Sequence, residues 1–182
     1  MRRALSIAVV ALAMCALPGD AAAHDSPPTH RAVVQADRGA LSVLVTYEPG
    51  RNKAGDPGLG ALTASAYGEA RKRVLEATLS ARALAPLRVT VNGAPINFDR
   101  VRTKVVFGRG PGGYTVYVLA TARVARGQVV RASMTSDPHV ARKAPGAARI
   151  SWLDRSGKRV TAAAPQRRWL PAGTEIALRF AR

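Results

Sequence analysis

Histidine is the residue type through which this sequence is best placed to do chemistry. The chain contains three histidines, His24, His30 and His139. His139 closes the segment Ser136-Asp137-Pro138-His139. In an extended segment positions i and i+2 point to the same side, so Asp137 and His139 can face one ion together. The pattern indicates metal binding, with imidazole as the main ligand.

The residues before His24 make it the expected first residue of a mature chain. Arg2 and Arg3 precede an apolar run, residues 5–17, which Pro18 breaks and residues 21–23 (Ala-Ala-Ala) follow. These are the parts of a secretory signal in the right order. The run is shorter than the roughly 20 residues of a membrane span. We therefore expect residues 1–23 to be a cleaved signal peptide and the protein to be periplasmic or secreted.

The chain has a single cysteine, Cys15. A lipoprotein anchored through Cys15 is the less favoured alternative, because Met14 is bulkier than the small residue that precedes a lipidated cysteine. Cleavage after Ala23 removes Cys15, so the mature domain has no disulfide and no thiolate chemistry. The remaining chain, roughly 160 residues, is long enough to fold as one domain without disulfides.

A mature N-terminal histidine offers both its amine and its ring nitrogen to one ion. A second histidine completes a three-nitrogen set that suits Cu(II). We therefore predict a copper or nickel site made by His24, His139 and Asp137, with His30 as a spare ligand. Met134 lies close in the sequence and is expected to assist with Cu(I).

These residues resemble those of a known family. An N-terminal His with a later Asp-x-His in a cysteine-free β-rich chain resembles the periplasmic copper-binding proteins of the CopC type, on His24, Asp137 and His139 alone. The resemblance implies a β-sandwich that binds copper. In this chain the spacing is longer, and a helix and a final hairpin are extra.

A second resemblance concerns the layout of residues 31–135. Strand, loop and helix followed by residues 87–93 (Leu-Arg-Val-Thr-Val-Asn-Gly) is similar to the extracytoplasmic region of HupE/UreJ-type nickel and cobalt transporters, which also begin with Ala-His after the signal. The resemblance implies a membrane transporter as a partner. After the signal, this chain has no apolar run long enough to span a membrane.

Hydropathy patterning predicts which elements position these residues. Residues 41–47 alternate as a half-buried strand does, and Asn92-Gly93 is a strong hairpin signal. A helix is expected near residues 63–83, ended by Pro86 and packed through an apolar stripe with Tyr67 and Leu75 beside it. The stripe residues are Ala66, Ala70, Val74, Ala77 and Ala81. The expected strands are residues 32–36, 40–48, 87–91, 96–98, 101–107, 114–124, 129–135, 149–153, 159–163 and 175–180.

The predicted fold is mainly β: an antiparallel, Ig-like β-sandwich with one inserted α-helix. Residues 24–30 form a polar N-terminal arm, and residues 31–182 form a single β-rich domain. No nucleophile or zinc-protease motif is present, and the few acids lie beside turns, so we expect a binding protein and not an enzyme. A copper oxidase acting on polysaccharide is disfavoured by the low aromatic content.

The charge of +17 leaves a second function open. A basic envelope module that binds anionic polymers, an anionic envelope surface or a protein partner without any metal fits it equally well. Specific nucleic-acid binding is not expected, because the basic residues are dispersed and the aromatic residues lie in apolar strand contexts that predict core positions. These aromatic residues are Tyr114, Tyr117, Trp152 and Trp169.

Overall fold

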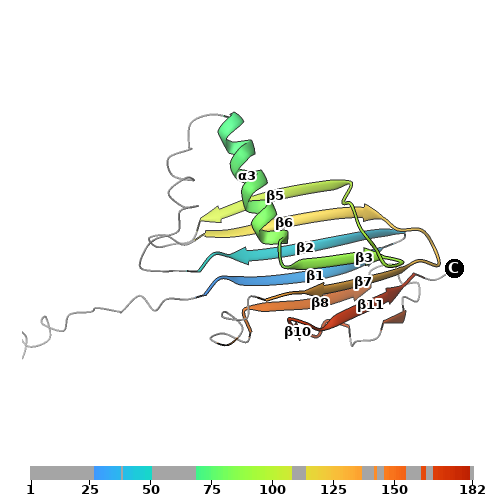
Figure 1. The fold of residues 1–182 in the computed structure, drawn as a ribbon. Helices are drawn as coiled ribbons and strands as arrows, with labels where there is room; N and C mark the ends of the chain where they lie inside the picture. The colour runs from blue at the N-terminus through green and yellow to red at the C-terminus, as the bar shows by residue number, and fades with distance from the viewer. Residues whose placement is uncertain are drawn as a thin grey trace, which may run out of the picture.

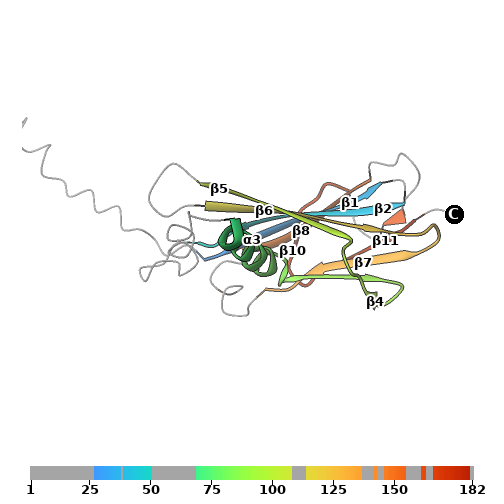
Figure 2. The same ribbon diagram turned by 90° about the horizontal axis from the view of Figure 1, so that it is seen from above.

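The computed structural model describes residues 27–37, 39–50, 69–107, 114–136, 142, 146–154, 161–162 and 166–180. Over these ranges the chain forms eleven strands and one helix, arranged as two facing sheets (Figures 1 and 2). The fold is mainly β and sandwich-like with one helix, as the sequence predicts. No helix in the described ranges is both long and apolar enough to cross a membrane.

The larger sheet has six strands. Their order across the sheet is β10 (Leu170–Pro171), β8 (Ala148–Asp154), β1 (Thr29–Asp37), β2 (Ala40–Glu48), β6 (Tyr114–Arg123) and β5 (Arg100–Phe107). Neighbours pair antiparallel, except β1 and β8, which run parallel. The alternation predicted for residues 41–47 is confirmed: Leu41, Val43 and Val45 are fully buried on the inner face.

The smaller sheet has five strands. Their order is β4 (Ala94–Pro95), β3 (Leu87–Val91), β7 (Val129–Met134), β11 (Glu175–Arg179) and β9 (Thr161–Ala162). Val130, Ile176 and Leu178 are fully buried and belong to one core cluster with the inner face of the larger sheet. Burial of these branched side chains on both inner faces is what holds the two layers together.

The helix, α3 (Glu69–Leu84), lies on the same side of the six-stranded sheet as the five-stranded sheet, and it contacts β2, β5 and β6 (Figure 2). Its end beside Pro86 agrees with the prediction, and the predicted start near residue 63 lies outside the described residues. Leu79 and Ala83 are fully buried, and the Ser80 hydroxyl shares a hydrogen bond with the Thr103 hydroxyl of β5.

The predicted packing stripe of α3 is wrong at three of its positions, and Ala66 lies outside the described residues. Val74 is 68 % exposed, and Ala77 and Ala81 are also exposed. The helix instead packs through Leu75, Leu79 and Ala83, which are spaced four residues apart and so lie on one face. The leucines bury more apolar area than alanines do, and this decides which face turns inward.

Besides shifts of one residue at several strand ends, the strands differ from the prediction in three respects. β1 begins at Thr29, so the last two residues of the predicted polar arm are strand residues. The hairpin at Asn92-Gly93 is confirmed, with φ of 51° and 87°, but β4 ends at Pro95 and residues 96–98 are not a strand. β10 was not predicted, because two residues are too few to show an alternating pattern.

Candidate functional site

His30 lies at the end of the sandwich where β1 begins. Its register partner in β2 is Tyr47, and the two rings stack with centroids 4.6 Å apart and planes inclined by 24°. Its backbone N–H donates to the Ala147 carbonyl at 2.6 Å. Its ring Nε2 lies 3.4 Å from the carbonyl oxygen of Arg82 in the last turn of α3. The orientation of this imidazole is therefore fixed by the β1 backbone, the Tyr47 ring and the last turn of α3.

The environment of His30 favours the neutral ring. Burial lowers the pKa of His30 below 6.5, and the contact with the Arg82 carbonyl opposes this in part. A carbonyl oxygen can only accept, so Nε2 carries the proton when this hydrogen bond forms, and Nδ1 keeps its lone pair. A neutral imidazole with one nitrogen tied to a carbonyl is the form in which histidine binds a metal ion.

A pocket of about 300 Å³ opens beside His30. Four segments line it: the start of β1, the end of α3, the residues after β7 and the turn before β8. Apart from His30 and Arg82, its wall is made of small or uncharged residues: Pro28, Ala85, Pro86, Thr135, Ser136, Ala147 and Ala148. Apart from Arg82, the pocket is therefore an uncharged recess with one fixed imidazole in its wall.

Three of the four predicted metal ligands, His24, Asp137 and His139, lie outside the described residues. The chain segments that lead to them, in contrast, lie within the described residues. Pro28 lines the pocket four residues after His24, and Ser136 lines it directly before Asp137. The structure therefore brings the two chain segments that lead to these predicted ligands to one pocket.

The described residues alone do not make a metal centre. Within these ranges no three His, Cys, Asp or Glu side chains gather closely enough to hold an ion. His30, predicted as the spare ligand, is the one candidate ligand that the structure places in the pocket wall. Met134, expected to assist with Cu(I), is fully buried opposite Leu87 and is not part of the pocket wall.

Two aromatic residues predicted to be core are at the surface. Tyr114 and Trp152 are buried, as predicted, but Tyr117 is 38 % and Trp169 43 % exposed. Residue parity offered a signal for Tyr117, since the buried residues of β6 are the even-numbered ones: Tyr114, Val116, Val118, Ala120 and Ala122. Comparisons of the chain with protein-family models, with curated proteins and with solved structures found no match.

Proposed function

We propose that this chain is an exported binding protein of the cell envelope that holds one Cu(II) or Ni(II) ion at the end of the sandwich marked by His30. The observation that carries the proposal is the lining of the pocket. Segments that are more than a hundred residues apart in the sequence, and that lead to His24 and to His139, line one recess with a neutral imidazole in its wall.

The ligand roles follow from chemistry. The amine and imidazole of His24 form a chelate, and His139 supplies a second imidazole, which together make a nitrogen set suited to Cu(II). His30 adds an imidazole whose orientation is fixed by Tyr47 and the Arg82 carbonyl, so binding through it costs little side-chain entropy. Asp137 serves as a weak axial ligand or orients His139. The chain acts by binding, without catalysis, and a membrane transporter is the natural partner to receive the ion.

Native mass spectrometry of the secreted protein with one equivalent of Cu(II) or Ni(II) tests this proposal. The apo mass gives the cleavage site. We expect a start at His24 and one retained ion, lost on His139→Ala and weakened on His30→Gln. A protein that starts at His24 and retains neither ion would end the proposal.

The acidic ligand has a matched control in the chain. Asp137→Asn is expected to weaken retention of the ion, whereas Asp37→Asn, at the far end of β1 from His30, leaves it unchanged. Both variants remove one negative charge, so a general effect of charge would weaken both equally. Addition of one residue before His24 is expected to abolish the chelate, because the free amine then no longer belongs to the histidine.

A further inference from the structure

The outer face of the six-stranded sheet combines positive charge with exposed apolar surface. Strand register places five residues in one row across this face: Arg149, Arg31, Thr46, Tyr117 and Lys104. The next row is Ser151, Val33, Leu44, Leu119 and Arg102. Cations therefore stand toward both edges of the face, with apolar side chains between them.

The cations of this face have no acidic partner among the described residues. An ion pair within the described ranges joins Arg131 to Glu175 on the other sheet. Arg31 and Arg149 are direct register partners on one face, so their like charges repel each other. An anion placed between the two guanidinium groups would relieve this repulsion and accept hydrogen bonds from both.

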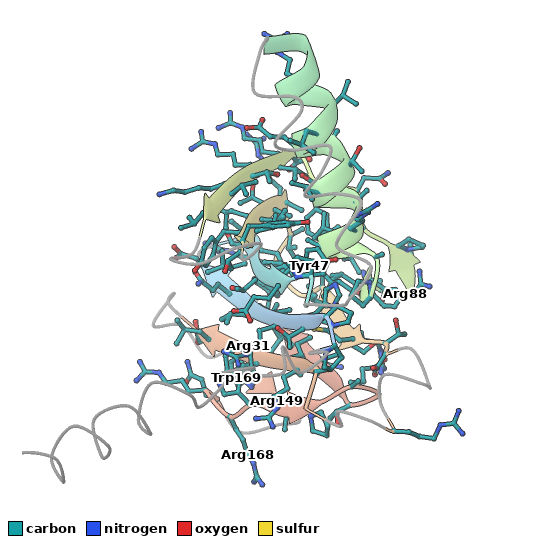
Figure 3. The ribbon with its side chains drawn as sticks, turned by 90° about the vertical axis from the view of Figure 1, so that its left-hand side faces the viewer. Arg31, Tyr47, Arg88, Arg149, Arg168 and Trp169 are labelled. Atoms are coloured by element: carbon teal, nitrogen blue, oxygen red, sulfur yellow. The ribbon has the colours of Figure 1, made fainter. Side chains whose placement is uncertain are left out.

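Trp169 stands at the same edge of the sheet. It directly precedes Leu170, the register partner of the inward-facing Ile150, so its backbone position belongs to the outer face. Continuing this register places Trp169 opposite Ser151, which is only 4 % exposed although it lies on the outer face. Figure 3 shows Trp169 with Arg31 and Arg149 on one side of the molecule, and Arg88 of the five-stranded sheet on the other.

Gly146 shapes the position of Arg149. A Cβ atom at Gly146 would lie 2.6 Å from Nη2 and 3.1 Å from Nε of Arg149, so the guanidinium group rests against the bare glycine backbone. A substitution that adds only a methyl group would displace the guanidinium without changing any charge.

We propose that Arg31, Arg149 and Trp169 form a binding site for an anionic polysaccharide whose sugars carry carboxylate groups. A planar guanidinium binds a carboxylate through two parallel hydrogen bonds, and the exposed indole offers a flat apolar surface to a sugar ring. Lys104 and Arg102, three strand spacings from Arg31 or about 14 Å, extend the positive surface for a polymer that lies across the strands. The site faces away from the His30 pocket, since Arg31 and His30 alternate along β1, so it is independent of the proposed metal site.

The test measures binding of polygalacturonate to the full chain, with an uncharged glucan as the reference polymer. We expect binding of the polyuronate alone, weakened as ionic strength rises. The double variant Arg31→Gln/Arg149→Gln is expected to bind about tenfold more weakly or worse. The matched control is Arg88→Gln/Arg179→Gln, which removes the same charge from exposed positions of the five-stranded sheet and is expected to change affinity by less than about threefold.

Two further variants separate the site from general charge. Trp169→Ala is expected to weaken binding while Trp169→Phe retains most of it, because phenylalanine keeps a flat apolar ring. Gly146→Ala is expected to weaken binding at unchanged net charge, because it displaces the Arg149 guanidinium. These surface variants should keep the thermal unfolding midpoint of the parent chain, which checks that each is folded.

Three results would overturn the proposal. Equal loss in the two double variants would show that net charge alone attracts the polymer. Unchanged affinity in both Trp169→Ala and Gly146→Ala would show that Trp169 and the position of the Arg149 guanidinium do not contribute to a binding site. Tighter binding of a single-stranded oligonucleotide than of the polyuronate at the same ionic strength would assign the face to nucleic acid.

Discussion

The two sheets differ in how their outer faces deal with charge. On the five-stranded sheet, Arg131 donates to Glu175 at 2.5 Å, and both side chains are about half exposed. On the six-stranded sheet, Arg31 and Arg149 face each other and form no ion pair with an acid among the described residues, and Tyr117 and Leu119 are each 38 % exposed. The outer face of the five-stranded sheet therefore neutralises part of its own charge through this ion pair. The outer face of the six-stranded sheet leaves both charge and apolar area available to a ligand, although the inner faces of the two sheets are equally well buried.

The largest expected effect tests whether the inner faces of the two sheets contribute equally to stability. Ile150 and Ile176 are both fully buried, one in each sheet. Each isoleucine-to-alanine change is expected to lower the free energy of unfolding by about 2–5 kcal/mol, from lost burial and the cavity left behind. Urea unfolding followed by circular dichroism measures this.

The control for these variants lies on the open outer face. Leu119→Ala is expected to cost less than about 1 kcal/mol, because this side chain keeps much of its surface in water. A cost as large as that of Ile150→Ala would mean that the outer face is packed and not open, and would break the comparison between the two sheets.

The next effect concerns the hairpin turn between β3 and β4 of the five-stranded sheet. Asn92 adopts a φ of 51°, and its side-chain oxygen accepts from the Val129 backbone N–H at 2.9 Å. Asn92→Ala is expected to cost about 1–2 kcal/mol, since alanine disfavours this conformation and supplies no acceptor. Asn92→Gly should cost less, because glycine tolerates the positive φ. Equal costs for the two in urea unfolding would show that the hydrogen bond alone matters.

A smaller, pH-dependent effect is expected at the end of the six-stranded sheet. Burial lowers the pKa of His30 below its usual 6.5, so the unfolded chain binds this proton more readily than the folded one. Stability should therefore fall as pH drops from about 7 through 6.5, and level off below the lowered pKa. Urea unfolding with a chelator present, across this window, should show a weaker pH dependence in His30→Gln. The same reduction in His139→Gln would contradict the assignment to His30.

The smallest effects concern the surface charges. Glu175→Gln is expected to cost about 0.2–1 kcal/mol at low ionic strength and less at high ionic strength. Arg31→Gln should be neutral or slightly stabilising, because it relieves the repulsion with Arg149. Thermal unfolding at two ionic strengths measures both. A clear destabilisation by Arg31→Gln would show that Arg31 has a stabilising contact in the folded chain.

Most strands could be predicted from the sequence because alternation has a period of two wherever one face is polar. The pattern is weaker in β6, where Tyr117 and Leu119 are as apolar as Val116 and Val118, so only Thr115, Thr121 and Arg123 mark the outer face. The same ambiguity misplaced the packing stripe of α3, since alanines and leucines both recur at helical spacing. Side-chain volume and the space under the helix decide the outcome, and neither is a property of local sequence.

The sequence predicts a chemistry for the candidate site but not its location. The prediction that His24, Asp137 and His139 form a ligand set rests on residue types alone, and none of these residues lies within the described ranges. Nothing local in the sequence indicates that Pro28 and Ser136 line one pocket or that His30 stacks on Tyr47. Those contacts arise from strand pairing over long sequence separations, which a pattern of neighbouring residues does not encode.

The parallel pairing of β1 with β8 has a consequence for the time at which this chain can fold. His30 pairs with Ala148, so the centre of the larger sheet joins residues more than a hundred positions apart. During synthesis, β1 cannot pair with β8 until β8, near the end of the sequence, has left the ribosome. High contact order of this kind slows folding. A polypeptide that stays unfolded during its synthesis can still pass through a translocation channel, which requires an unfolded chain.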